Sequence, residues 1–188
     1  EGDRIANIVK TLLFAAHGDS TEMSRVSIPD IVSDVMALSR TQLEHADIRL
    51  SLDLPDSLPA VLANGQQIQQ IFLNIINNAR HALEKRYPTS NMDKTLEITG
   101  EMHKSQDQQY VRISFTDHGT GIPADLLGRV LTPFFTTKPA GVGTGLGLSI
   151  SYEIVKKHGG HLAVESEEGK FTRVVIDECY LKSCSYTL

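Results

Sequence analysis

Apolar residues recur along this chain at the two spacings that distinguish helices from strands. Spacings of three and four positions predict helices, and strict alternation predicts half-buried strands. The segments expected to be helical are residues 1–17, 27–46, 64–86, 123–131 and 146–158. The segments expected to be strands are residues 47–54, 95–103, 110–117, 161–166 and 171–178. Strands and helices mixed in this way predict an α+β fold, a two-layer sandwich in which helices cover one face of a mixed, mostly antiparallel sheet.

The same pattern predicts which side chains form the core. In the longest helical segment the apolar side carries Ile68, Ile71, Phe72, Ile75, Ala79 and Leu83. In the helix before it the stripe is Ile31, Val35, Leu38 and Leu43. In the first expected strand the alternating residues are Ile48, Leu50, Leu52 and Leu54. In the first expected helix the stripe is Ile5, Ile8, Val9, Leu12 and Leu13.

A polar stretch, GDSTEMSR, separates the first expected helix from the rest of the chain and is a candidate domain boundary. We therefore expect a terminal helix over residues 1–19 and a main domain over residues 20–178. The tail over residues 179–188 carries no pattern that predicts a role.

Composition narrows the classes of function. The chain has 188 residues, of which 40% are hydrophobic, enough for a real core. Its net charge of -5 argues against a nucleic-acid partner, and no apolar run is long enough for us to expect membrane contact. Cys179 and Cys184 do not make a disulfide framework, so a reducing, cytoplasmic setting is expected, while membrane anchoring of a longer parent protein stays open.

Polar residues on the longest predicted helix form a row. Gln70, Asn74 and Asn78 are each four positions apart and so lie on one face. Such a row can be an ordinary solvated face. Alternatively, the carbonyl oxygens of Asn74 and Asn78 suit Mg²⁺, which prefers oxygen ligands and often binds jointly to protein and phosphates.

The segment FTDHGTGI, residues 115–122, ends a predicted strand in Asp117 and then turns through Gly119 and Gly121. Glycines allow a close approach of backbone to a ligand. A buried carboxylate at a strand end can accept a hydrogen bond from an exocyclic amine such as that of adenine. The alternative is a simple turn in which Asp bonds locally.

The segment LTPFFTTK, residues 131–138, places Phe134 and Phe135 in a polar loop. These two aromatic side chains either pack into the core or stay exposed to bind a partner. Lys138 can reach a phosphate, or it can be one more surface lysine.

Glycines are densest in GVGTGLGLSI, residues 141–150, just before a predicted helix. Gly143, Gly145 and Gly147 expose backbone N–H groups at the positive end of a helix dipole, which favours phosphate. The pattern lacks the Gly-Lys-Ser/Thr of a Walker A motif. It also lacks the preceding strand of a dinucleotide fingerprint.

The order of these four motifs resembles the N, G1, F and G2 boxes of the GHKL (Bergerat) fold. Over roughly residues 28–178 the chain is similar to the catalytic, ATP-binding domain of sensor histidine kinases. PFFTTK…GTGLGLSI is the most specific part. The resemblance implies that the cofactors are ATP and Mg²⁺, and that residues 1–19 end the dimerisation and phosphoacceptor hairpin.

The resemblance also implies roles for single residues. Asn78 and Asn74 would hold Mg²⁺, Asp117 would bind the adenine amino group, and residues 132–145 would form a mobile lid. Gly169 to Thr172 would match the last, weakest motif on the adenine side. Expected catalytic residues are Asn74, Asn78 and Lys138. Expected nucleotide contacts are Asn78, His81, Asp117, Gly119, Gly121, Ile122, Phe135, Thr136, Thr137, Lys138, Gly143, Thr144, Gly145, Leu146, Gly147, Leu148 and Thr172.

The residue at position 74 distinguishes groups of proteins within the GHKL fold. The hydrolytic ATPases and serine kinases of this fold resemble one another in having Glu four residues before the Asn that holds magnesium, and a carboxylate there can act as general base. Asn74 has no useful basicity, whereas a neutral histidine acceptor needs less activation. The resemblance therefore favours transfer of the γ-phosphoryl group to histidine, through positioning and charge neutralisation.

The acceptor histidine is expected outside this sequence, because no histidine here has the expected phosphoacceptor context and His17 is typical of a surface residue. The implied partners are ATP or ADP, a phosphoacceptor helix of the same or a partner subunit, and a response-regulator receiver domain, with a homodimeric parent protein. Two other functions stay open: a degenerate module that docks partners through Phe134 and Phe135, and a hydrolytic ATPase.

Overall fold

The computed structural model describes residues 22–105, 108–139 and 142–179. The predicted helix over residues 1–17 lies outside the described residues. The described helices are α2 (Ile28–His45), α3 (Gly65–Arg86), α4 (Ala124–Leu127) and α5 (Gly147–Lys157). The described strands are β1 (Ser24–Val26), β2 (Arg49–Asp53), β3 (Val61–Ala63), β4 (Thr95–Ser105), β5 (Gln108–Asp117), β6 (His161–Glu167) and β7 (Phe171–Cys179).

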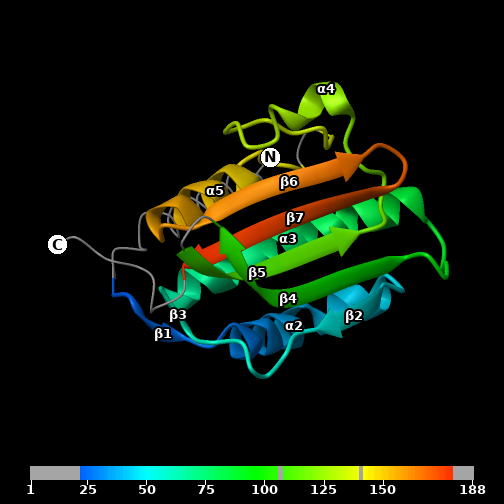
Figure 1. Ribbon diagram of the computed structural model, residues 1–188. Helices are drawn as coiled ribbons and strands as arrows, with labels where there is room; N and C mark the ends of the chain where they lie inside the picture. The colour runs from blue at the N-terminus through cyan, green and yellow to red at the C-terminus, as the bar shows by residue number, and fades with distance from the viewer. Residues whose placement is uncertain (1–21, 106–107, 140–141, 180–188) are drawn as a thin grey trace.

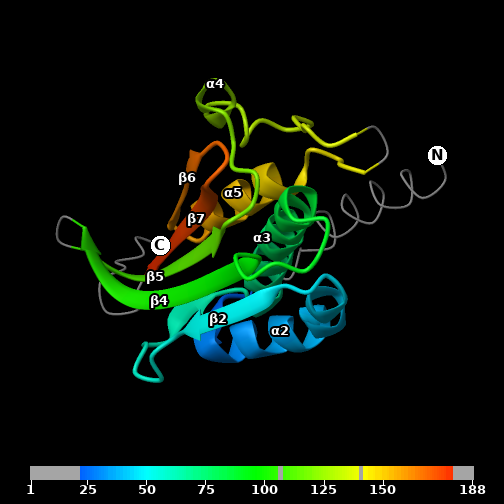
Figure 2. The same ribbon diagram turned by 90° about the vertical axis from the view of Figure 1, so that its right-hand side faces the viewer.

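Five strands form one sheet in the order β2-β4-β5-β7-β6. β2 runs parallel to β4, and the other neighbouring strands are antiparallel. Helices α2, α3 and α5 lie together on one face of this sheet (Figure 1), and the view along its edge shows the two layers (Figure 2). This arrangement confirms the predicted α+β sandwich with a mixed, mostly antiparallel sheet.

The helix ends follow from local capping. Ser27 Oγ accepts a hydrogen bond from the N–H of Asp30, and Pro29 is in the first turn of α2. Asn64 Oδ1 accepts from the N–H of Gln67 and caps α3. In the core the ring of Phe72 on α3 lies 5.1 Å from that of Phe115 on β5. The six apolar residues predicted for α3 are all buried.

Some sequence predictions were wrong. Leu38, expected in the buried stripe of α2, is 62% exposed, because the buried positions of this helix follow Val35 and Ser39 instead. Leu50 and Leu52 are 38% and 49% exposed, because β2 is an edge strand that is incompletely covered. The helix expected over residues 123–131 is the single turn α4.

The sequence pattern also missed a small second sheet, in which β1 pairs antiparallel with β3. It places the start of the described chain beside the N-terminus of α3. Within the described residues, no helix combines the length and the apolar character that crossing a membrane requires.

Candidate functional site

Asp117 ends β5, the central strand of the sheet, and only 6% of it is exposed. It pairs with Leu96 on β4 and with Thr172 on β7, so its carboxyl group lies in the middle of the sheet edge. Burial raises the pKa of Asp117 to about 7, while the N–H of Gly119 and the nearby His118 lower it. The carboxyl group is therefore poised between its two protonation states near neutral pH.

The loop after Asp117 requires glycine. The N–H of Gly119 donates to Asp117 Oδ1 at 2.9 Å. A Cβ at position 119 would meet Asp117 Oδ1 at 2.6 Å and the backbone of Ala82 on α3 at 2.7 Å. Gly121 has φ +64°, and a Cβ there would lie 2.1 Å from the carbonyl oxygen of Glu167. These contacts press the loop against α3 on one side and against the β6–β7 turn on the other.

A small network of hydroxyl groups joins this loop to β6 and β7. Ser166 Oγ accepts from the N–H of Ile122 at 2.8 Å and lies 3.0 Å from the hydroxyl oxygen of Thr172. Ser166 also donates to the carbonyl of Phe171 at 2.6 Å. Ile122, Thr172 and Asp117, all predicted to contact the nucleotide, therefore lie at one edge of the sheet.

The predicted row of amides on α3 separates into different environments. Asn74 Nδ2 donates to the carbonyl of Gly147 at 3.3 Å and to Ser151 Oγ at 3.4 Å, so it joins α3 to α5. Asn78 Oδ1, one turn later, accepts a hydrogen bond from Lys138 Nζ at 2.8 Å. Gln70, one turn earlier, lines a separate groove. The row is thus not an ordinary solvated face.

Lys138 joins the loop between α4 and α5 to α3. The described residues 132–139 and 142–145 of this loop are called the lid loop below. Burial is the main cause that lowers the pKa of Lys138, and the charge of Arg80 adds to it. Burial also lowers the pKa of His81, and Lys138 lowers it further. The Lys138 ammonium group thus donates to Asn78 Oδ1, the oxygen predicted to bind Mg²⁺, and the basic side chains of Arg80 and His81 lie nearby.

Gly143 and Gly145 of the lid loop pack closely against other residues of the same loop. Gly145 has φ +67°, and a Cβ there would lie 2.4 Å from the backbone of Phe134. Phe134 itself has φ +65°, an uncommon conformation for a bulky residue. A Cβ at Gly143 would lie 2.4 Å from Thr136 Oγ1 and 3.0 Å from Lys138.

The two aromatic residues of this loop behave differently. Phe134 is 71% exposed, so it does not close the core. Phe135 is half-buried, and the guanidinium of Arg129 lies 4.5 Å from its ring centroid. This cation–π contact holds the start of the loop.

The lid loop leads into the N-terminus of α5. Leu146 is the N-cap residue, and no side chain caps this end. The N–H of Leu146 binds Thr144 Oγ1 at 3.3 Å. The uncapped end of an eleven-residue helix leaves N–H groups that can bind an anion, and Gly147 and Leu148, which are predicted nucleotide contacts, lie in this first turn. Thr136 and Thr137 are exposed in the same loop.

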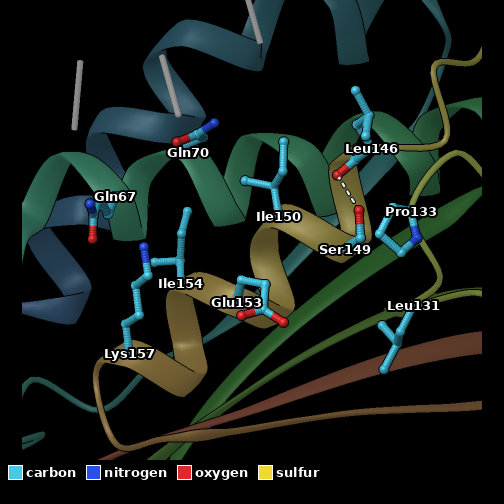
Figure 3. Close-up of a pocket in the computed structure, with 10 residues that line it drawn as sticks. All are labelled: Gln67, Gln70, Leu131, Pro133, Leu146, Ser149, Ile150, Glu153, Ile154 and Lys157. Carbon is cyan, nitrogen blue, oxygen red and sulfur yellow. Dashed lines mark hydrogen bonds between the residues drawn. The ribbon is translucent and has the colours of Figure 1, made fainter. Parts of the chain in front are cut away.

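A groove of about 250 Å³ is lined by the first half of α3, by α5 and by Leu131 and Pro133 (Figure 3). Its polar residues include Gln67, Gln70, Glu153 and Lys157, and its apolar residues include Ile150. It is distinct from the sheet edge at Asp117.

Sequence reasoning missed two residues that shape the site. Ser166 carries the hydroxyl network, and Arg86, the last residue of α3, donates to backbone carbonyls of two loops. Neither belongs to a motif, and each binds a backbone group of the loop after β5 that is more than thirty positions away in sequence. Arg86 did have one signal, its place as a basic residue at a predicted helix end.

The chain is similar to known proteins in sequence and in structure. Residues 63–181 match the family described as "Histidine kinase-, DNA gyrase B-, and HSP90-like ATPase". The chain is 36% identical over 169 residues to sporulation kinase E of Bacillus subtilis, covering 90% of this chain and 21% of that protein. It is 35% identical to sensor kinase CckA of Brucella abortus, covering 90% of this chain and 18% of that protein. It thus spans about a fifth of these curated relatives.

Solved structures give the same picture. The catalytic domain of histidine kinase ThkA superposes with a TM-score of 0.69 at 26% identity, covering 85% of this chain and 96% of that chain. Full-length ShkA, solved in complex with AMPPNP, gives a TM-score of 0.67 at 25% identity, covering 84% of this chain and 31% of that chain.

Proposed function

Because the chain belongs to the histidine kinase-, DNA gyrase B- and HSP90-like ATPase family, we propose that it is the ATP-binding catalytic domain of a two-component sensor histidine kinase. In this proposal the domain binds ATP and positions its γ-phosphoryl group for transfer to a histidine on a phosphoacceptor helix. A response-regulator aspartate then receives the phosphoryl group. Dimerisation of the parent protein and these partners belong to the proposal, since the chain spans 21% of sporulation kinase E.

One observation supports the proposal most directly. The buried carboxyl group of Asp117 and the side-chain amide of Asn78 lie on either side of the contact between the loop after β5 and α3. Gly119, which donates to Asp117, packs against Ala82 of α3. Asn78 lies one turn before Ala82 on the same helix. The adenine amine would donate to Asp117, with Gly119, Gly121, Ile122 and Thr172 around the base. The phosphates would then extend toward Asn78 and the lid loop.

The residues at the phosphate end suit an anion with a divalent cation. Asn78 Oδ1 already holds a cationic group, the Lys138 ammonium at 2.8 Å, so a hard cation fits there. Mg²⁺, when bound, would neutralise phosphate charge. Asn78 would be its main protein ligand, and Asn74 is the second ligand we predict. Lys138, His81 and the N–H groups from Gly143 to Leu148 would bind phosphate oxygens, with Phe135, Thr136 and Thr137 lining the lid loop.

Transfer to histidine is favoured over hydrolysis at this site. Asn74 stands where a general base would have to be, and its amide is engaged with α5. An amide cannot take a proton from water at neutral pH. The chain's own residues therefore orient and neutralise the triphosphate, and the lone pair of the incoming imidazole supplies the nucleophile.

Thermal unfolding with and without Mg²⁺ and AMPPNP tests the proposal. A ligand that binds only the folded state raises the midpoint by an amount that grows with its concentration. We expect such a rise, together with no steady release of phosphate from ATP. An unchanged midpoint at millimolar nucleotide would favour a partner-docking module instead, and steady phosphate release would favour a hydrolytic ATPase.

A further inference from the structure

Arg86 forms an unusual convergence of hydrogen bonds at the C-terminal end of α3. Its Nη1 lies 3.1 Å from the carbonyl oxygen of His118, 2.9 Å from that of Gly119 and 2.8 Å from that of Lys170. The first two oxygens belong to the loop after β5, and the third belongs to the turn between β6 and β7. One guanidinium nitrogen is therefore shared by two loops that are about fifty residues apart in sequence.

These two loops also bind each other directly. The N–H of Gly169 donates to the carbonyl of Thr120 at 2.7 Å. Gly121 lies so close to Glu167 that a Cβ could not be accommodated. The loops thus behave as one unit at the sheet edge, and Arg86 ties this unit to α3.

The contact to His118 reaches Asp117 through a single peptide group. The carbonyl of His118 and the N–H of Gly119 belong to the same peptide unit. Arg86 donates to the carbonyl oxygen of this peptide unit, and the N–H of the same unit, that of Gly119, donates to Asp117 Oδ1 at 2.9 Å. A charged donor on the oxygen orients the peptide and strengthens the hydrogen bond at its other end.

Several features fix the guanidinium in place. It lies 5.1 Å from the centroid of the Tyr87 ring, and the end of α3 favours a positive charge through the helix dipole. Arginine stays charged and offers several donors in one plane, whereas lysine offers a single ammonium group. A lysine here would make some of these hydrogen bonds with poorer geometry.

We infer that Arg86 is a positioning residue for the adenine end of the nucleotide, acting by holding the loop after Asp117 against α3. This inference rests on the proposed function. Arg86 itself binds carbonyl groups and is not expected to touch the phosphates, which lie toward Asn78. Loss of Arg86 should therefore affect recognition of the base and leave recognition of the phosphates intact.

The test compares two probes, adenosine and Mg²⁺ with inorganic tripolyphosphate, by NMR titration of the whole chain. The proteins are the wild type, Arg86→Gln, Arg86→Lys and the control Lys85→Gln, which changes an exposed neighbour on the same turn. For Arg86→Gln we expect adenosine binding to weaken about tenfold, as for loss of a charge-assisted hydrogen bond, with tripolyphosphate binding within about twofold of wild type. The adenosine affinity of Arg86→Lys should lie between those of the wild type and Arg86→Gln. Lys85→Gln should bind both probes like the wild type.

Unchanged adenosine affinity in both Arg86 variants would overturn the inference, and so would an equal loss of both probes, which indicates a general loss of structure. If Arg86→Gln does not fold, Arg86→Lys carries the same comparison, and a selective loss of adenosine binding supports the inference. A wild-type chain that binds neither probe would overturn the proposed function itself, an outcome distinct from the failure of Arg86 alone.

Discussion

Adenosine binding should strengthen as the pH rises from 6 to 8, because the carboxyl group expected to accept the adenine amine titrates in this range. Burial raises the pKa of Asp117 to about 7. The charged and polar groups that act on it are His118, which lowers this pKa, and the N–H of Gly119, which favours the ionised form. The ionised carboxylate is the better acceptor for an amine donor.

The magnitude follows from the fraction of ionised Asp117. With a pKa of about 7, roughly a tenth of the groups are ionised at pH 6 and roughly nine tenths at pH 8. If only the ionised form binds, the apparent Kd should fall about tenfold between these pH values, or about 1.4 kcal/mol. The same raised pKa means that Asp117 contributes stability to the free protein at low pH, which is lost as the pH rises through about 7.

The assay is an NMR titration with adenosine, which lacks phosphate groups that would titrate in the same range. Asp117→Asn should bind more weakly than the wild type at pH 8 and show little pH dependence. Asp125→Asn, which changes an exposed acid on α4, should keep the wild-type profile. Equal affinity at pH 6 and pH 8 in the wild type would refute the reasoning, because it would mean that the protonation state of Asp117 does not affect binding.

Three further substitutions test other parts of the account. Gly145→Ala should weaken Mg²⁺–AMPPNP binding at least about tenfold by calorimetry, because a Cβ would meet the Phe134 backbone at 2.4 Å and φ is +67°. Lys138→Gln should weaken ATP binding about tenfold and leave adenosine binding unchanged, because Lys138 Nζ binds Asn78 Oδ1, at the end of the site where we propose that the phosphates lie. Burial raises the pKa of Glu178 to about 8, so the stability that the Glu178 carboxyl group contributes is lost as the pH rises from about 4.5 to 8. Glu178→Gln should therefore raise the free energy of unfolding, measured with urea, by up to roughly 4–5 kcal/mol at pH 9 and change it little at pH 4.

Each of these substitutions has a matched control. Gly128→Ala adds a Cβ where no atom lies within 4 Å, and it should bind like the wild type. Lys156→Gln and Glu165→Gln change exposed residues of the same types. A lid role for Gly145 is contradicted if both alanine variants bind alike, and a phosphate role for Lys138 is contradicted if both lysine variants do. The destabilising role of Glu178 is contradicted if its stability gain is the same at pH 4 and pH 9.

Much of the fold could be predicted from the sequence, because burial on one side of an element leaves a periodic trace. The apolar stripe of α3 and the alternating residues of β5 gave these elements their correct places. β1 and β3 were missed because a strand of three residues is too short to show a period. The exposure of Leu50 could not be predicted, since it depends on β2 being at the sheet edge.

The candidate site shows a similar division. Asp117 and the glycines could be proposed from the sequence because a motif marks them. The bond between Lys138 and Asn78 joins residues sixty positions apart and depends on how the lid loop folds back. Arg86 was missed because it binds backbone carbonyls, which every residue provides, so no side-chain pattern marks its partners.

The central claim is that Asp117 and Asn78 bind opposite ends of one nucleotide. The most direct measurement is calorimetry of ADP binding, with and without Mg²⁺, to the wild type, Asp117→Asn and Asn78→Ala. We predict that Asp117→Asn loses affinity equally with and without Mg²⁺, whereas Asn78→Ala loses chiefly the gain in affinity that Mg²⁺ provides. Wild-type affinity in both variants would contradict the claim.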